Sequence, residues 1–137
     1  MKTFRRFLPF FVCLTGVAMV MHTQPAAPEA KEKSDRVLRH VVLLKFKEDA
    51  TEEQIREVEQ GFAALPEKID AIESFEWGTN NSPEMHSKGF THCFLVTFRD
   101  EEGRAEYLPH EEHQAFVEIL KPVLEDVLVV DYWTPAE

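Results

Sequence analysis

The chain has 137 residues, of which 44% are hydrophobic and 11 are Phe, and its formal net charge is −10. This length allows a single domain with a substantial core. The acidic balance disfavours nucleic acid and anionic lipid surfaces as partners, because phosphate groups repel a negatively charged protein.

The N-terminal segment has the layout of an export signal. Lys2, Arg5 and Arg6 form a basic head, residues 7–21 are apolar, and residues 24–30 are rich in Pro and Ala. This order is typical of a secretory signal peptide and predicts export to the periplasm, the cell envelope or the extracellular space. The apolar stretch is shorter than the roughly 18 to 20 residues that a spanning helix needs, so no stable transmembrane span is expected. An uncleaved N-terminal anchor is the alternative for residues 1–30.

A charged linker at residues 31–36 separates this leader from one predicted domain at residues 37–134. Without residues 1–30, the chain keeps 12 Lys and Arg against 24 Asp and Glu, a formal charge of −12. The domain itself is therefore acidic.

The domain is predicted to begin with a strand followed by a helix. Residues 37–46 are rich in β-branched and aliphatic side chains and are apolar on both faces. Thr51 followed by Gln54 forms a capping box, which indicates a helix start. An amphipathic helix of about four turns should follow, and Pro66 should end or kink it.

Two further strands are predicted in the middle of the chain. Residues 72–78 alternate, with Phe75 and Trp77 on one side and polar side chains on the other. Residues 80–89 are polar and contain Pro and Gly, which predicts a loop. Residues 90–98 have the strongest strand pattern of the chain.

Helical patterns return in the C-terminal third. Asp100 can cap a short helix that runs to about Tyr107. A second helical run carries an apolar stripe from His113 to Leu124, and Pro122 is expected to bend it late.

The last predicted strand, residues 127–133, completes the order β-α-β-β-α-β. This order predicts an α+β, ferredoxin-like domain with helices on one face of an antiparallel sheet. The strands that begin near residues 37, 90 and 127 are apolar on both faces, so the second face must also be covered. A second copy of the sheet would cover it, and we therefore expect a homodimer in which two sheets close into an α/β barrel.

Three histidines are expected to lie between the sheet and the helices. His40 and His92 share strand faces with apolar residues, and His113 lies on the apolar stripe of the last helix. If those faces are the helix-covered ones, the imidazoles meet in a small pocket, where they could act near neutral pH.

Several motifs in this order resemble the stress-responsive A/B barrel (Dabb) domain family. They are Arg-His-Val-Val-Leu-Leu-Lys-Phe-Lys from residue 39, Trp-Gly-Thr-Asn from residue 77, Gly-Phe-Thr-His from residue 89, and Tyr-Leu-Pro-His-Glu-Glu-His-Gln-Ala-Phe from residue 107 through Val-Val-Asp-Tyr. The resemblance covers about residues 39–134 and implies a dimeric ferredoxin-like barrel.

The resemblance also implies site residues, through a plant polyketide cyclase of the family that performs an intramolecular aldol condensation without a cofactor. Carried over by position, His113 would be the catalytic base and Tyr107 the hydrogen-bond donor, with His40 and His92 binding the ligand. The chain departs from that enzyme at Phe62, an aromatic without a hydroxyl, so the same substrate is not implied.

Three functional interpretations remain open from the sequence. The preferred one is an exported homodimer that binds a small hydrophobic or carbonyl ligand in the His/Tyr-lined pocket. A cofactor-independent cyclase or lyase is the first alternative, and a monooxygenase-like dimeric barrel is the second, by fold analogy alone. No metal site is expected, because His110 and His113 have i, i+3 spacing and lack a third ligand. No cofactor is expected either, as the resemblance implies.

Overall fold

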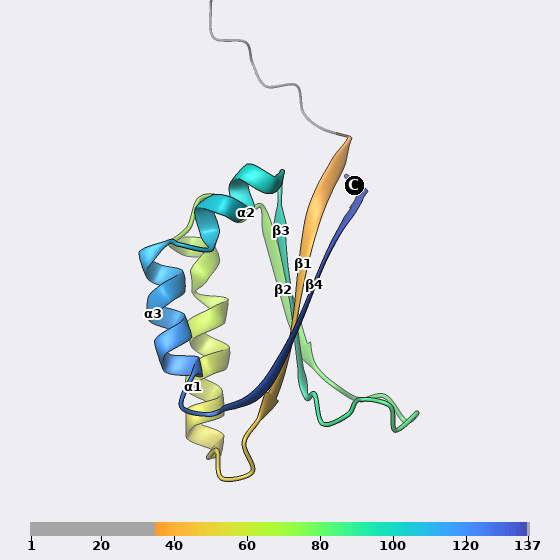
Figure 1. Ribbon diagram of the computed structural model, residues 1–137, viewed down its shortest axis with the longest axis vertical. Coiled ribbons are helices and arrows are strands. Elements are labelled where there is room, and N and C mark those ends of the chain that lie inside the picture. The colour runs from red at the N-terminus through yellow and green to blue at the C-terminus, as the bar shows by residue number, and fades with distance from the viewer. Residues whose placement is uncertain (1–34, 137) are drawn as a thin grey trace, which may run out of the picture. The chain divides into compact units, whose positions relative to one another are not determined.

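The computed structural model describes residues 35–136 and contains a four-stranded antiparallel sheet with helices packed on one face (Figure 1). In chain order, the elements are β1 (Arg36–Phe46), α1 (Glu52–Ala63), a 3-10 turn η1 (Leu65–Glu67), β2 (Ser74–Thr79), β3 (His92–Phe98), α2 (Glu101–Tyr107), α3 (Glu111–Leu120) and β4 (Leu124–Pro135). The strand order is β2-β3-β1-β4. The predicted ferredoxin-like α+β fold is confirmed.

The predicted export signal and most of the charged linker lie outside the described residues. Within residues 35–136, no helix is both long and apolar enough to cross a membrane.

The start and end of α1 follow from local sequence signals. The Gln54 amide N–H donates to Thr51 Oγ1 at 3.2 Å, and the Thr51 N–H donates to Gln54 Oε1 at 2.9 Å. This reciprocal capping box satisfies two backbone donors at the helix start, as the sequence predicts. The α-helix ends at Ala63, and Pro66 lies in the 3-10 turn that follows.

The C-terminal helix differs from its prediction. Asp100 does cap α2, accepting a hydrogen bond from the Gly103 N–H at 3.0 Å. However, α3 already ends at Leu120, so Pro122 lies beyond the helix rather than bending it. Leu124 belongs to β4 and not to the apolar stripe of the helix. Pro has no N–H and its ring clashes with the preceding turn, so the chain leaves the helix before it.

The strand register determines which side chains face the helices. On β1, His40 lies between its pairing partners Val96 and Asp131, and Leu44 lies between His92 and Val127. Directly paired residues point to the same side of a sheet, so all of these side chains face the helices. The core is built on this side, from Leu38, Val42, Leu44, Val58, Phe62, Leu65, Ile69, Ile72, Phe94, Val96, Phe98, Tyr107, Phe116, Leu120 and Val123.

The other side of the sheet, which we call the outer face, has no helix over it (Figure 1). Its side chains are those that alternate with the core residues: Arg39, Val41, Leu43, Cys93, Leu95, Leu128, Val130 and Tyr132. On β4, Leu128, Val130 and Tyr132 are 40%, 48% and 45% exposed. An apolar strand this exposed is unusual for a soluble surface.

Candidate functional site

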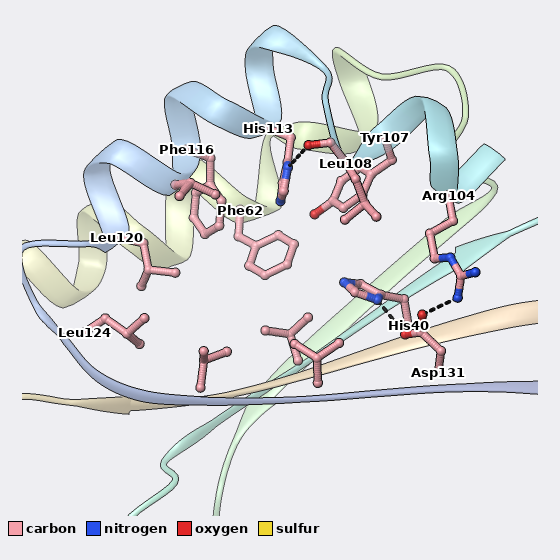
Figure 2. A pocket seen from close by; sticks show the side chains of 14 residues that line it. His40, Phe62, Arg104, Tyr107, Leu108, His113, Phe116, Leu120, Leu124 and Asp131 are labelled. Carbon is pink, nitrogen blue, oxygen red and sulfur yellow. Dashed lines mark hydrogen bonds and ion pairs between the residues drawn. The ribbon is translucent and has the colours of Figure 1, made fainter. Parts of the chain in front are cut away.

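A cavity of about 520 Å³ lies between the sheet and helices α2 and α3, on the β1 and β4 side (Figure 2). One end of it is polar, with His40, Arg104, Tyr107, His113 and Asp131. The remaining lining residues are apolar: Val42, Phe62, Leu108, Phe116, Val117, Leu120, Leu124, Val127 and Val129. A concave apolar site with a few convergent polar groups is the usual form of a small-molecule pocket.

Tyr107 and His113 meet at the helix side of the cavity. Their ring centroids are 4.3 Å apart, and the Tyr107 side chain is fully buried at the end of α2. Figure 2 shows the Tyr107 hydroxyl directed toward the cavity. The two side chains are therefore in contact with each other on one side of the cavity.

The backbone fixes the orientation of the His113 ring. Its Nδ1 lies 2.9 Å from the carbonyl oxygen of Leu108, and a carbonyl can only accept, so Nδ1 carries the proton. In the neutral ring, Nε2 then has a free lone pair, and Figure 2 shows that nitrogen facing the cavity. His113 is thus oriented as a hydrogen-bond acceptor or base.

Burial sets the protonation states of these two groups. Partial burial lowers the pKa of His113 below its ordinary value, against the raising effect of the Leu108 hydrogen bond, and the nearby His40 and His110 lower it further. Burial raises the pKa of Tyr107 well above its ordinary value. At neutral pH the pair is a neutral imidazole beside a neutral phenol, which suits proton acceptance by one and hydrogen-bond donation by the other.

His40 approaches the same space from the sheet. Its ring centroid is 6.0 Å from that of Tyr107, and its Nδ1 is 2.7 Å from Asp131 Oδ1 on the neighbouring strand β4. The other carboxylate oxygen of Asp131 accepts from Arg104 at 2.5 Å. Partial burial alone would raise the pKa of Asp131, but the hydrogen bonds from His40 and Arg104 outweigh it and hold that pKa below its usual range. The carboxylate is therefore ionised at neutral pH.

His92 lies on the helix-facing side, as its strand parity predicts, but it does not line this cavity. Its Nε2 is 2.9 Å from Glu59 Oε1 on α1, and its Nδ1 is 2.8 Å from Thr91 Oγ1. In the antiparallel register His92 pairs with Leu44, four positions from His40, which is about 13 Å along the strand. The structure thus brings together His40, Tyr107 and His113 without His92, whose role in ligand binding stays a prediction.

His110 has a structural position at the start of α3. Its Nδ1 accepts a hydrogen bond from the Glu112 N–H at 3.2 Å, so the imidazole caps the helix. Between residues 35 and 136, no group of three His, Cys, Asp or Glu side chains is arranged to hold a metal ion.

Two residues of the polar end, Arg104 and Asp131, were not identified from the sequence. Asp131 had a visible signal, since it is an acidic residue on the apolar, helix-facing side of β4. Arg104 had only a weak signal, as the basic residue of a seven-residue helix three positions before Tyr107. Their pairing joins α2 to β4 and depends on tertiary structure.

Comparison with known proteins agrees with this architecture. The model of the family described as Stress Responsive A/B Barrel Domain matches residues 38–134. The chain is 38% identical over 101 residues to stress-response A/B barrel domain-containing protein HS1 of Arabidopsis thaliana, covering 74% of this chain and 93% of that protein. It is 30% identical over 95 residues to olivetolic acid cyclase of Cannabis sativa, covering 69% of this chain and 94% of the cyclase.

A solved structure gives the same fold. A dimeric protein of unknown function with a ferredoxin-like fold, from Bacteroides fragilis, superposes with a TM-score of 0.58 at 30% identity, covering 70% of this chain and 94% of that chain. The range matched by the family model runs from within β1 to within β4. From residue 38 to residue 134, the chain belongs to the stress responsive A/B barrel domain family.

Proposed function

We propose that the protein binds a small ligand with a carbonyl or other neutral polar head and an apolar body in the cavity beneath α2 and α3. The observation that carries this proposal is the convergence of Tyr107, His113 and His40 at one end of an otherwise apolar cavity of about 520 Å³. The Tyr107 hydroxyl can donate to a carbonyl oxygen, and the apolar walls can enclose a hydrocarbon part.

The experiment is mass spectrometry of small molecules that co-purify with the protein. We expect a bound species in the wild type and its loss in His113→Ala. His86→Ala is the matched control, because His86 is exposed in the β2–β3 loop. Wild-type protein without any bound species, from a native source and at native protein levels, would contradict the proposal.

A cofactor-independent cyclase or lyase reaction is the second candidate. It is supported by the 30% identity to olivetolic acid cyclase and by the neutral imidazole of His113 in contact with the Tyr107 phenol. In such a reaction, His113 Nε2 would remove a proton from the carbon beside a carbonyl, and the Tyr107 hydroxyl would stabilise the enolate oxygen. Turnover of a carbonyl ligand that is lost in Tyr107→Phe, with binding retained, would distinguish catalysis from binding.

A homodimer formed through the outer face is part of this proposal. It is supported by the exposed apolar side chains of β4 and by the dimeric Bacteroides fragilis relative. Val130→Asp places a charge among the exposed apolar side chains of β4 on this face and should give a monomer in light scattering. Ile119→Asp, at a similarly apolar but helical surface position, should leave the mass unchanged. A Val130→Asp protein that keeps the wild-type mass would exclude this interface.

Export is also proposed, from residues 1–30 alone. N-terminal sequencing of protein from the native cells tests it, since a mature chain that begins between residues 18 and 31 is expected. A cytoplasmic protein that retains Met1 would contradict export.

A further inference from the structure

Asp131 holds one donor on each carboxylate oxygen. His40 Nδ1 lies 2.7 Å from Oδ1, and the Arg104 guanidinium lies 2.5 Å from Oδ2. The three side chains come from β1, α2 and β4, and all of them line the cavity. Figure 2 shows the chain of contacts at the polar end, with Arg104 on the far side of Asp131 from the His40 ring.

The contact between His40 and Asp131 decides which nitrogen of the imidazole faces a ligand. An ionised carboxylate can only accept, so Nδ1 of His40 carries the proton and Nε2 is the acceptor in the neutral ring. Across residues 35–136, every buried polar side-chain atom has a hydrogen-bond partner. The hydrogen bond of the His40 side chain is made by Nδ1, so Nε2, which has no partner, is not buried and opens to the cavity that His40 lines. Two imidazoles, those of His40 and His113, therefore present Nε2 toward the same space.

The orientation of Asp131 depends on its second partner. Its side chain is 25% exposed, so water competes for the carboxylate oxygens. A carboxylate held on one oxygen only can rotate toward water, whereas an Arg on the second oxygen opposes that rotation. The Arg104 side chain is itself only 27% exposed, which places this ion pair at the edge of the cavity rather than on the open surface.

We propose that Arg104 is a positioning residue, which holds Asp131 against His40 and thereby keeps the Nε2 atom of His40 available as an acceptor in the cavity. This inference rests on the proposed function, because it assigns a role within the same pocket. It adds a second oriented imidazole to the one on α3, so that a ligand held by Tyr107 has an acceptor on the helix side and another on the sheet side.

The same ion pair limits the class of ligand. Among the described residues that line the cavity, Arg104 is the only Lys or Arg and Asp131 is the only acidic residue. Because the two neutralise each other, the polar end has no free positive charge for a carboxylate or phosphate ligand. A neutral carbonyl or hydroxyl head is the chemistry that fits.

The test is nitrogen NMR of the ligand-free protein, with the His40 signals assigned by comparison with His40→Asn. In the wild type, we expect the neutral His40 ring to show a protonated Nδ1 and an unprotonated Nε2. In Arg104→Met, the two nitrogen signals should move toward each other, as in a mixture of tautomers. Arg104→Lys keeps a positive charge near Asp131 and should restore most of the wild-type pattern.

A matched control removes an ion pair of the same kind elsewhere. Arg99 pairs with Glu73 at 2.9 Å, and its side chain is 59% exposed, so Arg99→Met should leave the His40 signals unchanged. Wild-type signals in Arg104→Met, or a protonated Nε2 in the wild type itself, would overturn the proposal. The second observation does not need Arg104→Met, so it stands even if that variant does not fold.

Because the measurement uses ligand-free protein, its failure is distinct from failure of the proposed function. Absence of any ligand would leave the His40 tautomer as it is. Conversely, a ligand lost in His113→Ala together with unchanged His40 signals in Arg104→Met would retain the pocket and reject the role of Arg104.

Discussion

The helix-facing side of the sheet carries two histidine–carboxylate pairs that are locally almost equivalent. His40 pairs with Asp131 and His92 pairs with Glu59, and the two histidines are 6% and 8% exposed. The carboxylate side chains are also alike, at 25% and 24% exposed. Only one of the two pairs borders the cavity beneath α2 and α3.

The difference lies in what surrounds each pair. The His92 ring packs against Phe46 at 5.0 Å, Phe94 at 6.2 Å and Trp77 at 6.3 Å, so aromatic side chains surround it within the layer. His92 also borders a second cavity of about 580 Å³, which is lined largely by polar residues of the β2–β3 loop. Around His40, the corresponding space is left open below α2 and α3. A buried histidine with a carboxylate partner is therefore not in itself a sign of a site. His40 also has aromatic neighbours, Tyr107 at 6.0 Å and Phe98 at 6.1 Å, so the informative feature is the cavity with convergent polar groups beside it.

The largest expected effect is a difference in stability loss between substitutions in the packed aromatic cluster near His92 and substitutions in the lining of the cavity near His40. Phe94→Ala removes a fully buried ring that stacks on Phe62 at 4.4 Å, and it should lower the free energy of unfolding by about 3–5 kcal/mol. Leu120→Ala, at a residue that lines the cavity, should cost nearer to about 2 kcal/mol, because its side chain already borders empty space. Urea denaturation at one fixed protein concentration measures both. Equal losses of unfolding free energy in Phe94→Ala and Leu120→Ala would mean that the surroundings of these two side chains are equally well packed.

The second effect distinguishes the roles of the two histidines, one in stability and the other in ligand binding. His92→Ala leaves Glu59 without its imidazole partner and should cost about 1–3 kcal/mol of unfolding free energy, with the ligand retained. His40→Ala should instead lose the ligand that co-purifies with the wild type. Ligand mass spectrometry and denaturation on the same samples give both results. Loss of ligand in His92→Ala would establish the ligand-binding role that the sequence predicts for it.

The smallest effect is a pH dependence of the free energy of unfolding that arises from His113 beside the cavity. Partial burial lowers the pKa of His113 in the folded protein, so the unfolded chain binds the proton more readily. The free energy of unfolding should therefore fall as the pH drops through the ordinary value of 6.5 and toward the lower folded value. His113→Asn should flatten this slope between about pH 8 and about pH 5.5. A slope that is identical in His113→Asn would assign it to other groups.

Asp131 contributes to the pH dependence of stability in a separate pH range. Its pKa is lowered in the folded state, so its stabilising effect is present above the ordinary value of 3.8 and is lost only as the pH falls below that value. The two contributions can thus be separated within one titration.

Much of the fold could be predicted because its signals are local. The capping box of Thr51 and Gln54 and the cap at Asp100 involve neighbours in sequence, and both form as predicted. Strand alternation correctly placed His40 and His92 on one side of the sheet. The bent helix was wrong because the apolar spacing continues into Leu124, although Pro122 had already ended the helix.

The site was harder to predict because it depends on register. Alternation gives the face of a strand but not the position along it, so it could not separate His40 from His92. The pairing of Arg104 with Asp131 links residues that are 27 positions apart and has no local signal. The resemblance to a known family supplied Tyr107 and the role of His113, and the structure places these two side chains in contact.

Strand β4 is shared by the two surfaces that matter most in this molecule. Val127, Val129 and Asp131 form the floor of the cavity, whereas Leu128, Val130 and Tyr132 alternate with them on the outer face. Any movement of this strand changes both the cavity and the outer face. A second copy bound to the outer face would therefore restrain the cavity floor. By thermodynamic linkage, a ligand that favours the restrained strand must then strengthen association by the same factor. Ligand affinity should consequently rise with protein concentration.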